Sequence, residues 1–236
     1  MPNSEHIVSS FDRDLEGIQA KIMRLGGLVE EAIAKSVEAL ETRDAELART
    51  VRQADKAVDA LEEQVNEDAA RIIALRQPIA SDLRTVLTVF RVSANLERIG
   101  DYAKNIAKRS QSVIELDDIP GTAASLKRMA RQVELMLKDV LDAYIQQDAD
   151  LAEDVRQRDL EVDQMYSALF REYLTHMMED PRNITSCMHL HFMAKNIERM
   201  GDHVTSVAEQ VIYLVTGEMP DEDRPKEDKT PYMQGA

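Results

Sequence analysis

The chain has 236 residues, of which 44% are hydrophobic and 31% are charged, and its formal net charge at pH 7 is −15. A strongly acidic chain has no general basic face with which to neutralise phosphates, so we expect no nucleic-acid partner. Aromatic residues make up only 4% and tryptophan is absent. The core must therefore consist of aliphatic side chains and methionine, which favours packed helices over sheets.

The single cysteine and the N-terminal sequence indicate the cellular compartment of the protein. Cys187 is alone, which excludes an intrachain disulfide and fits a reducing environment. The N-terminal stretch is polar and acidic, unlike a signal peptide. No segment approaches the roughly 20 apolar residues that a membrane span needs. We expect a cytoplasmic protein without direct membrane insertion.

Three helical patterns fill the first half. Apolar residues recur every three or four positions over residues 9–42. A second pattern begins after Asp44, a favourable N-cap, and is expected to break at Pro78. A third pattern runs over residues 79–113, and the segment ELDDIPGT that follows has the composition of a linker.

The second half repeats this plan. We predict a helix over residues 125–145, a helix from the N-cap Asp148 to about residue 178, a break at Pro181 and a helix to about residue 216. The charged, proline-containing tail, residues 219–236, is predicted to be disordered.

The two halves are an internal repeat. With a shift of 104 positions, residues 38–59 align with 142–163, and 11 of the 22 positions are identical. With a shift of 101, NLERIGD aligns with NIERMGD, so a small deletion near Pro181 is implied. We therefore predict an all-α fold of two tandem three-helix bundles related by a pseudo-twofold, residues 1–116 and 117–218.

An acidic, glycine-bearing motif occurs in both halves. Each copy places a glutamate and an aspartate four residues apart, with a glycine between them inside a helix. The like charges disfavour the helix by a few tenths of a kcal/mol and the glycine by about 1 kcal/mol. Two further aspartate pairs, Asp55 with Asp59 and Asp159 with Asp163, also lie four apart.

If neighbouring helices present these pairs to each other, four carboxylates meet, and only cations can neutralise them. Oxygen ligands on rigid helices suit Mg, Mn, Fe(III), Ca or, in part, Zn. A solvated acidic surface remains the alternative, because a chain with 44 Asp and Glu contains such pairs by chance. A motif inherited by duplication without a function is a second alternative. For the two glycines, close helix packing is favoured over a ligand role.

A helical wheel places Glu97 and Asp101 opposite the core stripe of their helix, at the end of a second apolar line. That line contains Leu83, Leu87 and Phe90, and it is a candidate dimer interface unless the monomer covers it.

Three further residues of the second half, His191, His203 and Cys187, are of types that can bind metal. His191 lies on the Glu198 side and could reach a metal, although an interface role is more usual for such a residue. His203 is expected to point away from the acidic pair. Cys187 is expected to be buried.

The sequence contains no catalytic motif that we recognise. No histidine follows a glutamate by three residues, as a ferritin-like di-iron site requires. A phosphate-binding glycine loop, a His-Glu-x-x-His motif and a nucleophile elbow are also missing. We expect a helical scaffold that binds metal and partner proteins, not an enzyme; a metal-dependent hydrolase or redox enzyme is the competing hypothesis.

The two repeats, with NLERIGDYAKNIAKR in the first and NIERMGDHVTSVAEQVIYLVTGE in the second, resemble the PhoU family of bacterial accessory regulators of phosphate-specific transport. The resemblance covers about residues 5–218. It implies two three-helix bundles and multinuclear metal clusters, with iron or zinc being typical. The ligands that it implies are Asp55, Asp59, Glu97 and Asp101 in the first half and Asp159, Asp163, Glu198 and Asp202 in the second.

The resemblance also implies a function. The chain is expected to be a negative regulator of phosphate uptake and of phosphate-starvation signal transduction. Its expected partners are the ATPase subunit of the phosphate ABC transporter and a sensor histidine kinase, through which it would lie peripherally at the inner membrane. A homodimer is expected. The alternative is a metal-free helical adaptor with acidic docking faces.

Overall fold

The chain folds into six long helices and one short 3₁₀ turn. The structure is a computed structural model that describes residues 3–220. No strand occurs in that part of the chain. The helices are α1 (Asn3–Glu41), α2 (Ala45–Arg76), α3 (Ser81–Ile114), α4 (Thr122–Gln146), α5 (Ala149–Glu179) and α6 (Ile184–Thr216), with η1 (Pro181–Asn183) between the last two. Of the tail predicted to be disordered, residues 221–236 lie outside this description.

The predicted helix boundaries are confirmed at the capped ends. The Asp44 side chain accepts hydrogen bonds from the backbone N–H groups of Glu46 and Leu47, and Asp148 caps α5 in the same way. Pro181 opens η1. At its start α1 is longer than expected, because residues 3–8 contain no glycine or proline to stop a helix.

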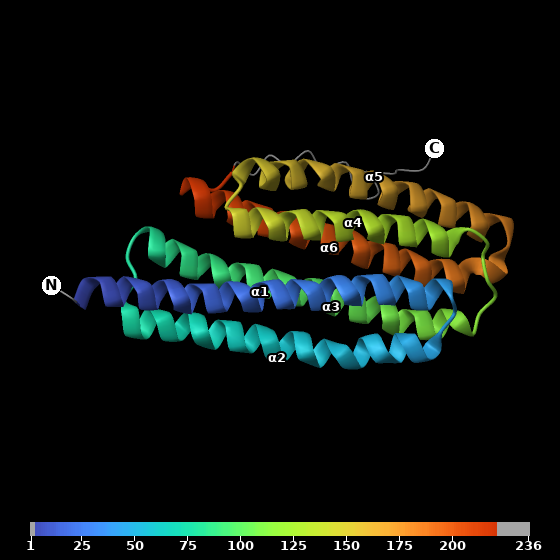
Figure 1. Cartoon of the computed structure of the whole chain (residues 1–236). Coiled ribbons are helices and arrows are strands. Elements are labelled where there is room, and N and C mark those ends of the chain that lie inside the picture. The colour runs from blue at the N-terminus through green and yellow to red at the C-terminus, as the bar shows by residue number, and fades with distance from the viewer. Residues whose placement is uncertain (1–2, 221–236) are drawn as a thin grey trace.

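Figure 1 shows two antiparallel bundles, α1–α3 below and α4–α6 above. The bundles meet along α3 and α6, which run antiparallel to each other, and α1 also packs on α4. The outer helices are α2 and α5. One large cluster of buried apolar side chains draws on all six helices. The predicted fold class is confirmed, and the two bundles share one core.

Cation–aromatic contacts lie at both ends of the α3–α6 seam. The Arg84 guanidinium carbon lies 5.9 Å from the ring centroid of Tyr213, and that of Arg109 lies 4.4 Å from the ring centroid of Phe192. Gly217 ends α6 with a φ of 84°, and a Cβ there would lie 2.5 Å from Arg84 Nη1.

Across residues 3–220, no helix is long and apolar enough to span a bilayer.

Candidate carboxylate sites

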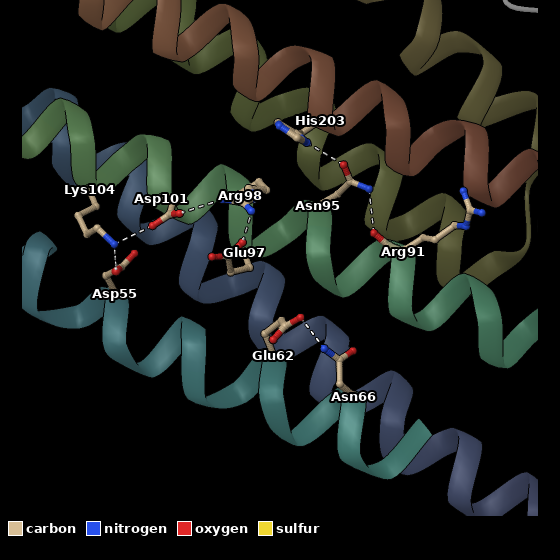
Figure 2. A network of polar contacts seen from close by, with 10 residues as sticks. All are labelled: Asp55, Glu62, Asn66, Arg91, Asn95, Glu97, Arg98, Asp101, Lys104 and His203. Carbon is tan, nitrogen blue, oxygen red and sulfur yellow. Dashed lines mark hydrogen bonds and ion pairs between the residues drawn. The ribbon is translucent and has the colours of Figure 1, made fainter. Parts of the chain in front are cut away.

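The first site lies between α2 and α3 (Figure 2). Lys104 Nζ lies 2.5 Å from Asp55 Oδ2 and 2.7 Å from Asp101 Oδ1. The Arg98 guanidinium lies 3.6 Å from Glu97 Oε2 and also 3.6 Å from Asp101 Oδ2. The Asp55 residue is only 7% exposed. An ammonium group thus joins carboxylates of two neighbouring helices.

Burial and neighbouring negative charge raise the pKa of two acids of the first site. Burial raises the pKa of Asp55, which Lys104 opposes and the charges of Asp59 and Asp101 reinforce. Burial also raises the pKa of Glu97, with Asp101, Asp59 and Glu62 adding to the rise and Arg98 opposing it. Asp59 and Asp101 therefore lie within electrostatic reach of both Asp55 and Glu97.

Glu62 belongs to this group, and the sequence analysis missed it. Figure 2 shows its side chain on α2 beside Asn66, with Glu97 on the facing helix α3. Asn66 Nδ2 donates to Glu62 Oε1 over 2.5 Å. The signal was present, because Glu62 follows Asp59 by three residues and so shares its helix face. The second repeat has Tyr166 at the corresponding place, so comparison of the repeats did not reveal it.

Lys104 remains an ammonium ion in this setting. Burial alone lowers the pKa of Lys104, but its hydrogen bonds and charge attraction to Asp101 and Asp55 outweigh burial and raise that pKa above its ordinary value. Lys104 therefore supplies a permanent positive charge at the first site.

The second site is a cavity of about 470 Å³ on α5 and α6, with Tyr102 of α3 in its wall. The complete lining is Tyr102, Asp163, Lys195, Glu198, Arg199, Asp202 and His203. Because Tyr102 belongs to the first repeat, this cavity is formed by both halves of the chain.

Glu198 is the most deeply buried acid of its motif. The residue is 7% exposed, and Lys195 Nζ donates to its Oε1 over 2.8 Å. Its other oxygen, Oε2, is buried without a hydrogen-bond partner. Burial raises the pKa of Glu198, with Asp202 and Asp163 adding to the rise and Lys195 opposing it. Three of the four predicted acids therefore converge here.

Asp159 is the fourth predicted acid, and it lies against the glycine of the motif. Asp159 is 6% exposed and does not line the cavity. Its Oδ1 is 2.9 Å from where a Cβ on Gly201 would lie. In the first repeat, a Cβ on Gly100 would lie 3.2 Å from Val58 Cγ1. The prediction that both glycines serve close helix packing is confirmed.

The two sites differ in burial and in their lysines. Asp59 is exposed, whereas its counterpart Asp163 is 6% exposed. Lys104 follows Asp101 by three residues, but Lys195 precedes Glu198 by three. The duplicated sequence thus retains the acids, and each repeat has its own lysine at a different position.

The expectation for His203 was wrong. Instead of pointing away, His203 lines the second cavity, and its Nδ1 lies 2.8 Å from Oδ1 of Asn95 on α3 (Figure 2). Its ring centroid is 5.6 Å from that of Tyr102. The helical wheel treated α6 alone, whereas α6 packs on α3 of the other repeat and the cavity extends to that seam.

His191 and Cys187 fit their more usual interpretations. The imidazole of His191 lies among the rings of Tyr166, Phe170 and Phe192, with centroid distances of 5.3 to 5.9 Å. It is not part of the cavity lining. Cys187 is fully buried, as predicted.

Comparison with known proteins identifies the family. The model of the PhoU domain matches the chain twice, over residues 22–110 and 126–211. The chain belongs to the PhoU family. A relative in Rhizobium meliloti (strain 1021), called phosphate-specific transport system accessory protein PhoU homolog, is 47% identical over 95% of both chains. A relative of the same name in Caulobacter vibrioides is 45% identical over 95% of this chain and 98% of its own.

Two PhoU crystal structures share the fold. PhoU from Pseudomonas aeruginosa superposes with a TM-score of 0.85 at 39% identity, covering 88% of this chain and 100% of that one. The phosphate transport system regulatory protein PhoU from Streptococcus pneumoniae gives a TM-score of 0.83 at 30% identity, covering 89% and 99%. The relatives are named accessory and regulatory proteins, in agreement with the prediction that the chain is not an enzyme.

The metal ions that the PhoU resemblance implies fit the donor atoms of these sites. Carboxylate oxygens suit hard and borderline cations, and the buried Oε2 of Glu198 is a ligand atom that has no hydrogen-bond partner. The present arrangement, however, is not a finished metal site. Within residues 3–220, no three His, Cys, Asp or Glu side chains are grouped to hold one ion. Lysine ammonium groups instead contact the acids at both sites.

Proposed function

We propose that this chain is an accessory regulator of a phosphate-specific transport system, and that it restrains phosphate uptake and phosphate-starvation signalling when phosphate is plentiful. The observation that carries the proposal is the PhoU domain in both repeats, together with a relative named as a phosphate-specific transport system accessory protein that matches 95% of the chain.

The proposed mode of action is that of an adaptor. The chain would contact the ATPase subunit of the phosphate ABC transporter and a sensor histidine kinase on the cytoplasmic side of the inner membrane. Its net charge of −15 supports this role, because complementary charge speeds encounters with basic partner surfaces. Its rigid helices, held by one shared core, suit a protein that joins two others.

Metal binding is the second element of the proposal. Asp55, Asp59, Glu97 and Asp101 would supply ligands at the first site, and Asp163, Glu198 and Asp202 at the second, with Asp159 beside them. Iron or zinc, in multinuclear clusters, would supply positive charge that lets these neighbouring acids ionise together. The support is the raised pKa of Asp55, Glu97 and Glu198, for which burial is the largest cause.

Deletion of the gene tests the regulatory role. The measurement is transcription from a phosphate-responsive promoter at high phosphate, with a strain that carries the restored gene as control. Deletion is expected to raise transcription, and the restored gene to bring it down again. Unchanged repression in the deletion strain would count against the proposal.

A metal-free adaptor with acidic docking faces is the second candidate. The specific observation in its favour is that Lys104 and Lys195 already neutralise acids at the two sites. Elemental analysis of protein purified without chelators separates the two candidates. More than one metal per chain, lost in Glu97→Ala/Asp101→Ala and in Glu198→Ala/Asp202→Ala, supports metal binding; no bound metal supports the metal-free adaptor.

A further inference from the structure

We propose that Lys104 and Lys195 are built-in counter-cations of the two carboxylate sites, and that a metal ion binds at each site only by displacing the lysine ammonium. This inference rests on the proposed metal binding and adds a control on it. It assigns a role to two residues that lie outside the eight predicted ligands.

The contacts of Lys104 carry the argument at the first site. Its ammonium joins Asp55 Oδ2 on α2 to Asp101 Oδ1 on α3, at 2.5 and 2.7 Å. These are two of the four predicted ligands. A metal ion bound by the same two oxygens would need the space that the ammonium now fills, and two cations so close would repel each other.

Lys195 has a related role at the second site. Its ammonium lies 2.8 Å from Glu198 Oε1 and 5.0 Å from the ring centroid of Tyr166. The aromatic ring offers the displaced ammonium a favourable contact outside the cluster of acids. Glu198 Oε2 has no hydrogen-bond partner and is already available as a ligand.

This difference predicts the order in which the sites fill. At the first site, a metal must break two charge-assisted hydrogen bonds that link α2 to α3. At the second site, one buried carboxylate oxygen is available before any bond breaks. We therefore infer that the second site binds the same ion more tightly than the first.

The two lysines do not correspond to each other in the internal repeat. With the repeat offset of 101, Lys104 corresponds to Thr205 and Lys195 corresponds to Ala94. Each repeat therefore places an ammonium against its acidic motif from a different helix turn. The two sites therefore reach the same pairing of ammonium and carboxylate through different positions.

Isothermal titration of the full-length, metal-free protein with Zn²⁺ tests the inference. Lys104→Leu and Lys195→Leu remove one ammonium each. Lys127→Leu is the matched control, because Lys127 pairs with Glu41 on the exposed α1–α4 face and touches neither site. Each site variant is expected to bind Zn²⁺ at its own site roughly tenfold more tightly or better, the factor for losing one competing charge-assisted hydrogen bond, and the control is expected to match the wild type.

Thermal melting and NMR distinguish a lysine that Zn²⁺ displaces from a lysine that only stabilises the fold. The site variants are expected to melt at a lower temperature without metal and to show a larger rise in melting temperature with Zn²⁺ than the wild type. In the wild type, the NMR signal of the hydrogen-bonded Lys104 ammonium, assigned by its loss in Lys104→Leu, is expected to disappear as Zn²⁺ is added. A purely structural lysine would lower the melting temperature and leave Zn²⁺ affinity unchanged.

The possible failures are distinguishable. If the wild type binds Zn²⁺ and both site variants bind it equally well, the counter-cation inference is wrong and proposed metal binding stands. If wild type and both variants bind no Zn²⁺, the metal proposal and this inference are both wrong. If only the variants bind, the lysines exclude Zn²⁺ outright, and both displacement of the lysines and metal binding by the native chain are wrong. Lys104→Gln provides the same test should Lys104→Leu fail to fold.

Discussion

The carboxylate of Asp159 lies where a side chain at Gly201 would begin, with Oδ1 only 2.9 Å from the position of a Cβ on that glycine. The glycine lets an acid of α5 approach the α6 backbone directly beside Glu198 and Asp202. In the first repeat the methyl group of Val58, not a carboxylate, lies closest to Gly100. Both glycines therefore allow close helix contact, and in the second repeat that contact also places an acid against α6.

Gly201→Ala is expected to destabilise the protein by about 1–2 kcal/mol, even though alanine favours a helix by about 1 kcal/mol. The new methyl group must push the carboxylate of the buried Asp159 out of position. Gly100→Ala is expected to be closer to neutral, because Val58 Cγ1 has to yield by only a few tenths of an ångström from 3.2 Å. Urea denaturation measures both changes.

Gly27→Ala is the matched control for these two substitutions. Gly27 lies within α1, is exposed, and a Cβ there would have no neighbour within 4 Å. This substitution is expected to stabilise the protein by about 0.5–1 kcal/mol through helix propensity alone. If Gly201→Ala stabilised the protein as much as Gly27→Ala does, the contact with Asp159 would have no energetic weight.

His191 is expected to make stability depend on pH. Burial, followed by the charge of Lys195, lowers the pKa of His191 below its ordinary 6.5. The folded state then binds fewer protons than the unfolded state, so the free energy of unfolding is intact above pH 6.5 and falls as the pH drops below it. His191→Phe copies Phe90 of the first repeat and is expected to reduce this fall. Denaturation at several pH values, with an NMR titration of His191, checks the sign; identical slopes in both proteins would contradict it.

The N-caps Asp44 and Asp148 occupy equivalent positions in the two repeats, and each is expected to stabilise its helix by a similar amount. Each carboxylate accepts two backbone hydrogen bonds at the start of its helix. Asp44→Ala and Asp148→Ala are each expected to lower the free energy of unfolding by about 1 kcal/mol, and the corresponding asparagine variants by much less. Thermal or urea denaturation measures the four variants. If the alanine and asparagine variants lost the same free energy of unfolding, the side-chain hydrogen bonds of the caps would not be its cause.

Substitutions at Leu87 and Met188 test the predicted homodimer. They occupy equivalent positions in the two repeats, on the second apolar line of α3 and its counterpart on α6, and they are 44% and 39% exposed. Leu87→Glu and Met188→Glu are expected to shift sedimentation from dimer to monomer, because a glutamate cannot be buried there unpaired. Ala60→Glu, at an exposed position of the outer helix α2, adds the same charge away from that line and is the control. A wild-type protein that sediments as a monomer at every concentration would contradict the prediction.

The sequence predicted the helices well, because their signals are local. The caps at Asp44 and Asp148, the breaks at Pro78 and Pro181 and the apolar spacing all act within a few residues. The carboxylate sites were predicted only in part, because they depend on how helices meet. Glu62 acts on Glu97 from the neighbouring helix, and Lys104 contacts an acid of another helix. Lys195 contacts Glu198 one turn along its own helix. A helical wheel of one helix does not show contacts between helices. His203 was misjudged for the same reason, since Asn95 lies 108 positions away in the chain.

The shared core changes what the duplication means for folding. Side chains of both repeats pack into one buried apolar cluster, and α3 and α6, which carry the acidic motifs, form its central contact. A fragment containing one repeat would expose the apolar surface that its partner covers, at roughly 25 cal/mol for each Å² uncovered. Each half has therefore become an obligatory partner of the other. A chain cut in the linker would need to behave as two subunits of a complex, each dependent on the other to remain folded.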